Sequence, residues 1–312
     1  MPKVLRIINR FNIGGPTYNA AYLTKYLPSE YETLLIGGDK EESEDSSQHI
    51  LNELGINPTI IPEMRRAIRF GNDYAAYKKI KQIIEEFKPD IVHTHASKAG
   101  TLGRMAAFAC NVPAVVHTFH GHVFHSYFSK AKTTIFKRIE KKLALKSSAI
   151  VAISAIQKEE LGTVHKIAPL DKIEVIPLGF DLERFQNNLE EKRAEFRKEY
   201  QIKDDEIAIG IIGRLVPIKN HQLFLNALRY VLDHTDKKVR AFIIGDGESR
   251  DAIINLAKDL NIPFSRSNVK FEISPLTLTS WIKNIDIVNA GMDIIALSSL
   301  NEGTPVSLIE AQ

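Results

Sequence analysis

The sequence predicts an α/β protein of two domains, each built on a parallel sheet. Short β-rich runs alternate with amphipathic helical runs, which is typical of parallel βαβ units. The order strand, glycine loop, helix occurs twice, starting near residues 4 and 207. The length of 312 residues also suits two domains. We expect residues 1–176 to form the first Rossmann-like domain. Residues 177–312 are expected to form a linker and a second such domain, with a cleft between the two.

In the first domain, runs rich in Val and Ile predict strands, and amphipathic runs predict the intervening helices. The expected strands are 4–8, 33–36, 90–95, 114–119, 149–153 and 173–176. One expected helix follows Gly14-Gly15-Pro16, and others cover 74–87, 100–109, 135–145 and 156–161. Proline suits the start of a helix because the N–H that it lacks has no partner there.

In the second domain the same alternation resumes after a linker at 177–188 and a strongly charged stretch at 190–203. The expected strands are 207–212, 240–244, 269–271 and 292–296, and the expected helices are 221–232 and 250–260. Near the end, Thr304 is expected as an N-cap and Pro305 as the first residue of a helix. Because the sequence stops at Gln312, we expect this domain to be incomplete and this chain to be a fragment or a poorly stable, weakly active form.

Composition narrows the class of protein. Hydrophobic residues make up 44% and charged residues 25%, as in ordinary soluble domains. A single cysteine, Cys110, rules out an internal disulfide and fits a reducing compartment, and no apolar run of membrane-spanning length is present. We therefore expect a cytoplasmic protein. Residues 1–175 carry 24 Lys+Arg and 18 Asp+Glu, against 17 and 20 in the remainder. This excess favours an anionic partner for the first half.

The segment from Glu302 to Glu310 predicts an anion site flanked by carboxylates. Free N–H groups of a first helical turn, together with the helix dipole, bind anions. Glu302 precedes that turn and Glu310 lies about one and a half turns beyond it. Carboxylates accept hydrogen bonds from hydroxyls. The pattern suits a nucleotide-sugar, with the diphosphate in the middle, ribose on one side and hexose on the other.

Two cations precede this segment, on the loop that follows the expected strand 207–212. Arg214 and Lys219 are five residues apart at the carboxyl end of that strand, where open α/β sheets bind ligands. The guanidinium offers a fork and the ammonium a point charge, so the pair can clamp a diphosphate. An isolated pair of this kind is usually two solvated charges; its place at a strand edge, upstream of Glu302–Glu310, favours a binding role.

Six of the ten histidines cluster in the first domain, and they leave two interpretations open. One is a metal site, since alternate strand residues share a face. The other is a set of histidines that pack at strand ends or line a cleft, and this is favoured because no Cys, Asp or Glu completes a recognisable zinc spacing. The six are His93, His95, His117, His120, His122 and His125.

Three segments in this order, GRLVPIKNHQLFLNAL, AFIIGDGESRDAI and LSSLNEGTPVSLIEA, resemble glycosyltransferase family 4. Upstream segments FNIGGPTYNAAYL, PDIVHTHASKAGTLGRMAA, VVHTFHGH and IEVIPLGFDLERF resemble the N-terminal domain and linker of the same family. The resemblance covers nearly the whole chain. It implies the GT-B fold and a retaining, nucleotide-sugar-dependent transfer.

The resemblance assigns catalytic roles to four residues. Arg214 and Lys219 would stabilise the diphosphate leaving group. Glu302 would contact a hydroxyl of the transferred sugar, and His120 would lie near its reacting face. Preorganised cations aimed at the departing charge supply the largest electrostatic term in such a reaction, so neither a metal nor another cofactor is expected.

The resemblance also assigns donor-binding roles. Glu310 would hold the ribose hydroxyls, and Gly303 and Thr304 would offer backbone N–H groups near the sugar. Gly14 and Gly15 would bring the backbone of the first domain close to the phosphates. For the isolated Gly14-Gly15 pair, a plain strand-to-helix turn is the alternative.

The expected partners are a nucleotide-sugar, with a UDP-sugar favoured, and a glycan or lipid-linked acceptor, in cell-surface polysaccharide or glycolipid assembly. No nucleic acid is expected. The helix within 130–146 carries seven Lys/Arg and one Glu, so it could rest peripherally on anionic lipid at the inner face of the membrane, or simply pack on the sheet. Two other functions stay open: a nucleotide-sugar epimerase on the same fold, and a non-catalytic nucleotide-sugar-binding fragment that needs a partner.

Overall fold

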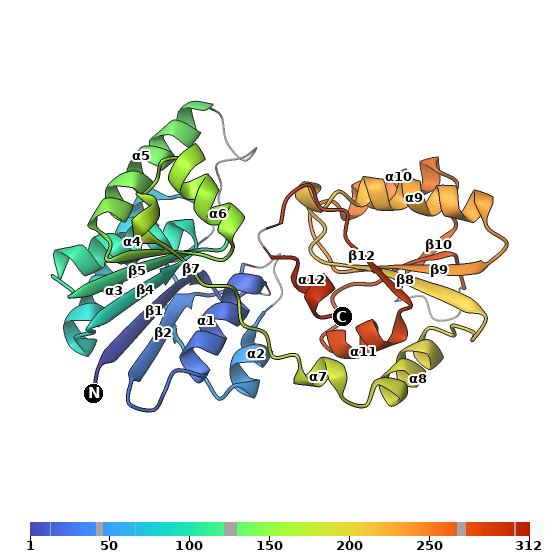
Figure 1. The fold of residues 1–312 in the computed structure, drawn as a ribbon, viewed down its shortest axis with the longest axis horizontal. Helices are drawn as coiled ribbons and strands as arrows, with labels where there is room; N and C mark the ends of the chain where they lie inside the picture. Colours follow the sequence, from blue (N-terminus) through green and yellow to red (C-terminus); the bar gives the residue numbers. More distant parts are fainter. Residues whose placement is uncertain (13, 42–45, 66, 122–129, 267–272, 303) are drawn as a thin grey trace. The chain divides into compact units, whose positions relative to one another are not determined.

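The computed structural model describes residues 1–312 apart from 13, 42–45, 66, 122–129, 267–272 and 303. The chain divides into two compact units, Met1–Gly179 and Phe180–Gln312 (Figure 1). The division falls three residues after the boundary expected from the sequence. Each unit contains one parallel sheet.

Unit 1 contains a seven-stranded sheet in the order β3-β2-β1-β4-β5-β6-β7, with every neighbouring pair parallel. Its strands are β1 (Lys3–Arg10), β2 (Glu32–Gly38), β3 (Thr59–Ile60), β4 (Ile91–His95), β5 (Ala114–Phe119), β6 (Ala149–Ala152) and β7 (Ile173–Val175). Strand order reverses beside β1, between the neighbours β2 and β4. Such a switch point in a parallel sheet leaves a crevice at the carboxyl ends of the strands.

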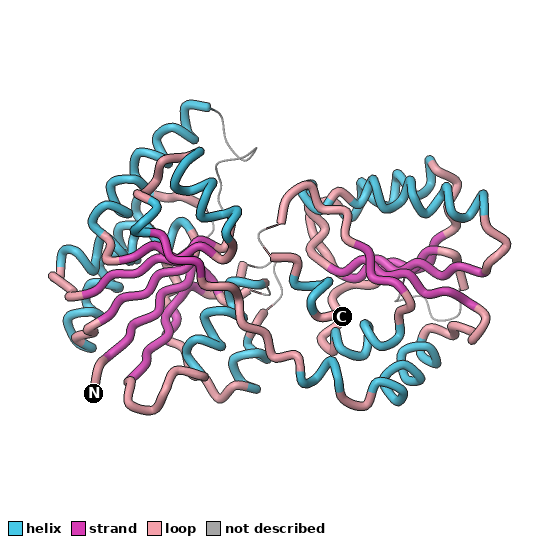
Figure 2. The backbone as a smooth tube through the Cα atoms, in the orientation of Figure 1, coloured by secondary structure: helices cyan, strands magenta, loops and turns pink. Residues whose placement is uncertain are grey.

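Helices cover both faces of this sheet (Figure 2). The apolar faces of α3 (Phe70–Phe87) and α4 (Ser97–Ala109) pack on Leu5, Ile7 and Val92. On the opposite face, α1 (Gly15–Lys25) and α2 (Gln48–Glu53) pack on Ile8 and Leu35. The remaining helices are α5 (Lys130–Lys146) and α6 (Ala155–Glu159), followed by a π-helical turn at Glu160–Val164 and a 3-10 turn at Leu170–Lys172. In the described part of the chain, no helix combines the length and apolar character needed to cross a membrane.

Unit 2 contains a five-stranded parallel sheet in the order β10-β11-β9-β8-β12. Its strands are β8 (Glu206–Ile212), β9 (Lys238–Ile244), β10 (Phe264–Arg266), β11 (Leu276–Leu278) and β12 (Ile294–Ala296). One face packs on α9 (His221–His234) and α10 (Arg250–Asp259), and the other packs on α8 (Leu189–Glu199) and α11 (Ile285–Gly291) (Figure 2). The short helices are α7 (Glu183–Gln186), a 3-10 turn at Pro217–Lys219, and α12 (Val306–Ile309).

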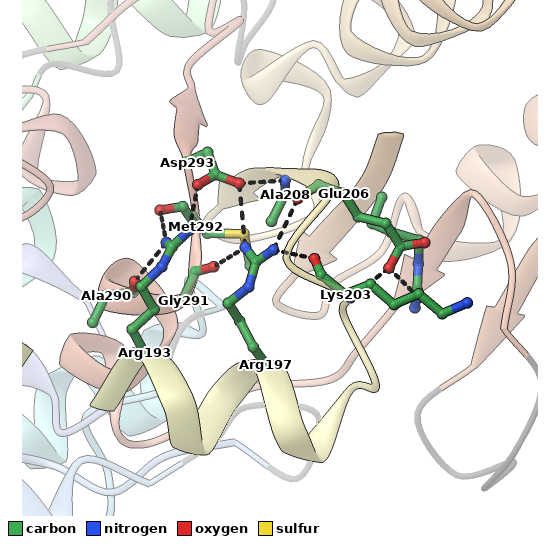
Figure 3. A network of polar contacts seen from close by, with 10 residues as sticks. Arg193, Arg197, Lys203, Glu206, Ala208, Ala290, Gly291, Met292 and Asp293 are labelled. Atoms are coloured by element: carbon green, nitrogen blue, oxygen red, sulfur yellow. Dashed lines mark hydrogen bonds and ion pairs between the residues drawn. The ribbon is translucent and has the colours of Figure 1, made fainter. Parts of the chain in front are cut away.

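Side chains of α8 hold the amino end of β12 (Figure 3). Asp293, just before that strand, accepts hydrogen bonds from Arg193 at 2.6 Å and from Arg197 at 3.3 Å. Its other contact is with β8, since the Ala208 N–H donates to Asp293 Oδ2 at 2.7 Å while the Asp293 N–H donates to the Ala208 carbonyl at 2.8 Å. Arg193 also donates to the carbonyls of Ala290 and Met292. The network therefore ties α8, α11, β8 and β12 together.

Several sequence expectations differ from this fold. The charged stretch at 190–203 contains α8, whose Phe196 is buried against Phe242 and Val288, so the charge run is the outer face of an amphipathic helix. Strands β10 and β11 were not expected because each has only three residues, and α11 was also missed. The expected strand 269–271 lies entirely outside the described part.

Candidate functional site

The candidate site of unit 2 lies at the carboxyl ends of β8 and β9. The backbone turns sharply after each strand, with φ of 154° at Gly213 and 139° at Gly245, a conformation that residues with a Cβ rarely adopt. A Cβ on Gly245 would lie 2.0 Å from the Gly213 carbonyl oxygen. The two loops thus touch backbone to backbone, and they are held by hydrogen bonds from Gly213 N–H to Ile244 O and from Leu215 N–H to Asp246 O, both 3.0 Å.

The loop after β12 is bonded to the loop after β8. The Leu300 N–H donates to the Ile218 carbonyl at 2.9 Å, and the Ser298 hydroxyl lies 3.0 Å from the carbonyl oxygens of Lys219 and Asn220. These contacts bring together two segments that are about eighty residues apart in sequence. They place the residues after Leu300 beside the 3-10 turn that carries Lys219.

Lys219 and Glu302 form an ion pair there, with Nζ and Oε1 2.5 Å apart. Both side chains are about three-quarters buried, with relative exposures of 25% and 23%. Lys219 is predicted to bind the diphosphate and Glu302 a sugar hydroxyl, and the structure brings the two side chains into direct contact. The carboxylate neutralises the cation, so an anion that binds Lys219 has to compete with Glu302.

Arg214 precedes this pair on the same loop and is partly exposed. Within the described residues, its side chain has no hydrogen-bond or ion-pair partner, which leaves the guanidinium able to bind an anion. The neighbouring turn after β9 is occupied differently: Asp246 accepts from its own loop at Gly247 N–H, from Arg250 and from Ser280. Arg214 and Lys219 are therefore the cations that this loop presents at the strand edge.

The helix start expected at Thr304 and Pro305 is shifted by one residue. The helix α12 begins at Val306, Pro305 is its N-cap with ψ of 71°, and no side chain caps it. The Val306 N–H donates to the Thr304 carbonyl at 2.9 Å, so one of the first-turn amides predicted to be free is already paired. With only four residues, α12 provides less dipole than the prediction required. Gly303 lies outside the described residues.

Glu310, at the end of α12, is half-buried, and burial raises the pKa of its carboxyl to about 7, with the Arg184 cation acting in the opposite direction. Its backbone carbonyl accepts from Asn289 at 3.2 Å. A carboxyl with a pKa near neutrality can either donate a hydrogen bond or, once ionised, accept several. Glu310 belongs to unit 2, like Lys219 and Glu302. Its backbone bonds Asn289, and its carboxyl interacts with Arg184.

In unit 1, Gly14 and Gly15 form the turn between β1 and α1. Gly14 is the N-cap of α1, and Pro16 occupies its first turn as expected. Gly14 accepts hydrogen bonds from Thr17 N–H at 3.0 Å and Tyr18 N–H at 3.4 Å. A Cβ on Gly15 would meet no atom within 4 Å, so open space lies over this turn.

His120 lies directly after β5, and the structure joins it to histidines of β4. Its Nε2 is 2.9 Å from His95 Nδ1, and the His95 and His93 ring centroids are 4.2 Å apart. Burial lowers the pKa of His120 to about 4, and lowers the pKa of His93 to about 3, with the Arg6 cation as a second cause. His117 points to the other face of β5, where it bonds Thr94. His122 and His125 lie outside the described residues.

The described histidines of this cluster are not part of a metal-binding group. Across the described ranges, no three or more His, Cys, Asp or Glu residues are grouped so that they could hold an ion. His95 and His120 direct one nitrogen each at the other, which uses a lone pair that a metal would need.

Comparison with known families decides the classification. Residues 13–184 match the model of Glycosyltransferase Family 4, and residues 192–312 match that of Glycosyl transferases group 1. The chain belongs to glycosyltransferase family 4. Among the curated members that it resembles is the Escherichia coli UDP-Gal:alpha-D-GlcNAc-diphosphoundecaprenol alpha-1,3-galactosyltransferase, 32% identical over 254 residues, which covers 81% of this chain and 62% of that protein. The Staphylococcus aureus capsular polysaccharide biosynthesis glycosyltransferase CapM is 27% identical over 62% of this chain and 50% of its own length.

Solved structures of several proteins share the fold. Anabaena HepE in complex with UDP and glucose superposes with a TM-score of 0.78 at 17% identity, covering 100% of this chain and 78% of that one. The UDP-GlcNAc 2-epimerase of Neisseria meningitidis, bound to UDP-GlcNAc, gives 0.63 at 15% identity, over 94% and 76%. The two parallel-sheet units therefore have the GT-B fold. Because transferases and epimerases both appear at such identities, the fold alone does not separate these reactions.

The sequence did not reveal the residues that hold the loop after β12 against the loop carrying Lys219. Ser298 and Leu300 hold the second loop against the first, yet backbone contacts leave no pattern in a sequence. His221, at the start of α9, is buried beside Lys219, and burial lowers its pKa to about 4. In the sequence, His221 could have been found from its position directly after the loop 214–220.

Proposed function

We propose that the whole protein transfers a sugar from a nucleotide-sugar to a hydroxyl of a glycan or lipid-linked acceptor. The observation that carries the proposal is the contact between Lys219 and Glu302 at the carboxyl edge of the second sheet, with Arg214 on the same loop, where it has no partner among the described residues. Two cations suit a diphosphate, and a carboxylate beside them suits a sugar hydroxyl. Membership of family 4 supports this assignment. The chain spans 62% or less of the length of the curated relatives named above.

We further infer that the donor is a UDP-sugar and that transfer proceeds with retention. The E. coli relative is described as using UDP-Gal, and the HepE structures hold UDP or UDP-glucose. In this proposal, Arg214 and Lys219 stabilise the leaving diphosphate, Glu302 binds a hydroxyl of the sugar, and Glu310 binds the ribose. His120 is proposed to lie near the reacting face of the sugar. No metal is required, because the two cations meet the developing charge.

Calorimetric titration of UDP, GDP, ADP and CMP into the chain tests the nucleotide site. We expect one of them, UDP, to bind, and the Arg214→Ala/Lys219→Ala double variant to lose that binding while it keeps its circular dichroism spectrum. Arg229→Ala, whose guanidinium pairs with Asp233 on α9, is the matched control for loss of an arginine in unit 2. Unchanged UDP binding by the double variant would refute the diphosphate clamp.

Turnover separates the reaction classes. UDP-sugars incubated with a diphosphate-lipid acceptor should give a glycosylated lipid and UDP, and proton NMR of the product should show the anomeric configuration of the donor. Addition of EDTA should leave the rate unchanged. An isomerised UDP-sugar formed without acceptor would instead identify an epimerase, and binding without either product would identify a binding module.

The assembly served by this reaction is proposed to be a cell-surface polysaccharide or glycolipid. The relatives include a capsular and a teichuronic acid glycosyltransferase.

We also propose that the described part of α5 rests on anionic lipid. Its exposed residues include Arg138, Lys141 and Lys142 together with the apolar Ile135 and Leu145. Sedimentation with phosphatidylglycerol vesicles, reduced by Lys141→Glu/Lys142→Glu, tests this; no sedimentation of the wild type at low salt would contradict it.

A further inference from the structure

In unit 1, His95 of β4 forms a hydrogen-bonded pair with His120, the half-buried residue that follows β5. His95 is the last residue of β4 and is fully buried, and its Nδ1 lies 2.9 Å from Nε2 of His120. In the parallel register His95 lies opposite Thr118, so His120, two residues further on, projects from the same face. The two rings are stacked, with centroids 5.2 Å apart.

The orientation of His95 is itself fixed. Its ring packs against His93, with centroids 4.2 Å apart, and His93 Nε2 lies 2.7 Å from the Thr118 hydroxyl. On this face, His93 is therefore bonded to β5 and His95 to the residue that follows β5. His120 follows the end of its strand, so His95 is the side chain that holds the His120 ring within the described residues.

Both imidazoles of the pair are neutral. Burial lowers the pKa of His95 well below its ordinary value, and the surrounding groups that act on it are His93, His120, Arg6 and His117, which oppose a positive charge. A hydrogen bond between two neutral imidazoles contains one proton, because each ring carries one N–H. The tautomer of one ring therefore dictates the tautomer of the other.

The outer nitrogen of His120 depends on this shared proton. If His95 donates from Nδ1, His120 carries its proton on Nδ1, which is then a donor. If His120 donates from Nε2, its Nδ1 is bare and accepts. In the structure His120 Nδ1 is buried and has no hydrogen-bond partner among the described residues, so it is the ring nitrogen whose hydrogen-bonding capacity is unused.

We propose that His95 is a positioning residue that fixes the ring orientation and the tautomer of His120. The proposal rests on the proposed function for what His120 then contacts, namely the sugar of the donor. The coupling between the two rings does not rest on it, because the contact exists in the ligand-free chain.

Nitrogen NMR of the ligand-free chain, labelled with ¹⁵N-histidine, tests the coupling. We expect the His120 nitrogens to report one tautomer in the wild type and a mixture, or the opposite tautomer, in His95→Ala. In His95→Asn the amide group can replace Nδ1, so the wild-type pattern should return. His117→Asn is the matched control, since His117 is an equally buried histidine with a hydrogen bond to Thr94 on the other face. Unchanged His120 shifts in folded His95→Ala would overturn the proposal.

A measurement on the wild type covers the case in which the variants fail to fold. A scalar coupling across the hydrogen bond between His95 Nδ1 and His120 Nε2 should be detectable, and its absence would contradict the pairing. In turnover assays with UDP-sugar and acceptor, His95→Ala should lower kcat by about tenfold or more with little change in KM, and His95→Asn should recover most of that loss. Absence of the scalar coupling in the wild type refutes this inference. Normal coupling, together with no product from UDP-sugars and acceptor in the whole protein, refutes the proposed function instead.

Discussion

A buried ion pair within unit 1 gives the sharpest stability prediction. Arg104 of α4 is fully buried, and it donates to Glu140 of α5 over 2.5 Å and to the Gly100 carbonyl over 2.7 Å. Its Nη1 is buried without a partner among the described residues. Glu140 is only 5% exposed. Glu140→Ala would leave a guanidinium, which cannot lose its proton, facing a single carbonyl.

The expected decrease in the free energy of unfolding follows from the loss of the only charged partner of Arg104 among the described residues. Removal of one member of a buried pair leaves an uncompensated charge and costs about 3–5 kcal/mol. Replacement of both members by apolar residues of similar size is close to neutral, so Arg104→Met/Glu140→Leu should recover most of the loss. Arg104→Met alone should cost less at low pH, because the isolated carboxyl of Glu140 can take up a proton.

Amide hydrogen exchange measures the two units separately. The loss predicted for Glu140→Ala corresponds to exchange of the α4 and β5 amides that is roughly 10²–10⁴-fold faster. The only tryptophan, Trp281, belongs to unit 2, so the urea transition of its fluorescence should stay unchanged. Exchange in α4 that slows or stays within about fivefold of wild type would refute the argument that this pair is desolvated.

Three further predictions concern unit 2. Glu302→Gln frees Lys219, so UDP should bind about two- to fivefold more tightly by calorimetry while sugar transfer falls. Because the pKa of Glu310 is raised to about 7, its carboxyl is mostly protonated at pH 6 and ionised at pH 8; if the ionised form binds ribose, affinity for a UDP-sugar should rise about tenfold over that range and become flat in Glu310→Gln. Gly245→Ala places a Cβ against the Gly213 carbonyl and should destabilise the unit by about 2 kcal/mol or more, seen as an earlier urea midpoint of tryptophan fluorescence.

Much of the architecture could be predicted from local patterns. Strand β5 coincides with the predicted 114–119, and the predicted 207–212 lies within β8, because buried parallel strands are continuous runs of apolar residues. The helix α8 was hidden because its exposed face is almost entirely charged and only Phe196 reveals the buried side. The strands β10 and β11 are too short to show a period.

The candidate site was predictable only in part. Family motifs identified Lys219 and Glu302, but their ion pair depends on hydrogen bonds from Ser298 and Leu300 to backbone atoms, which no side-chain pattern encodes. The N-cap at Thr304 was wrong because Pro305 adopts a non-helical ψ of 71°. For His120, the sequence indicated a cluster of histidines, while the direct bond to His95 required the register of β4 and β5.

The two reciprocal hydrogen bonds between Asp293 and Ala208 affect the other end of β12, where the loop that carries Glu302 begins. The strand β12 has only three residues, paired as Ile294 with Ile209 through Ala296 with Ile211, so its backbone alone gives little protection against slippage. Asp293 fixes the register at which β12 begins to pair with β8. A slip by one residue would carry the following loop along by about 3.3 Å and withdraw Glu302 from Lys219. Asp293 therefore contributes to the alignment of the ion pair from the opposite end of the strand, together with the hydrogen bonds of Ser298 and Leu300.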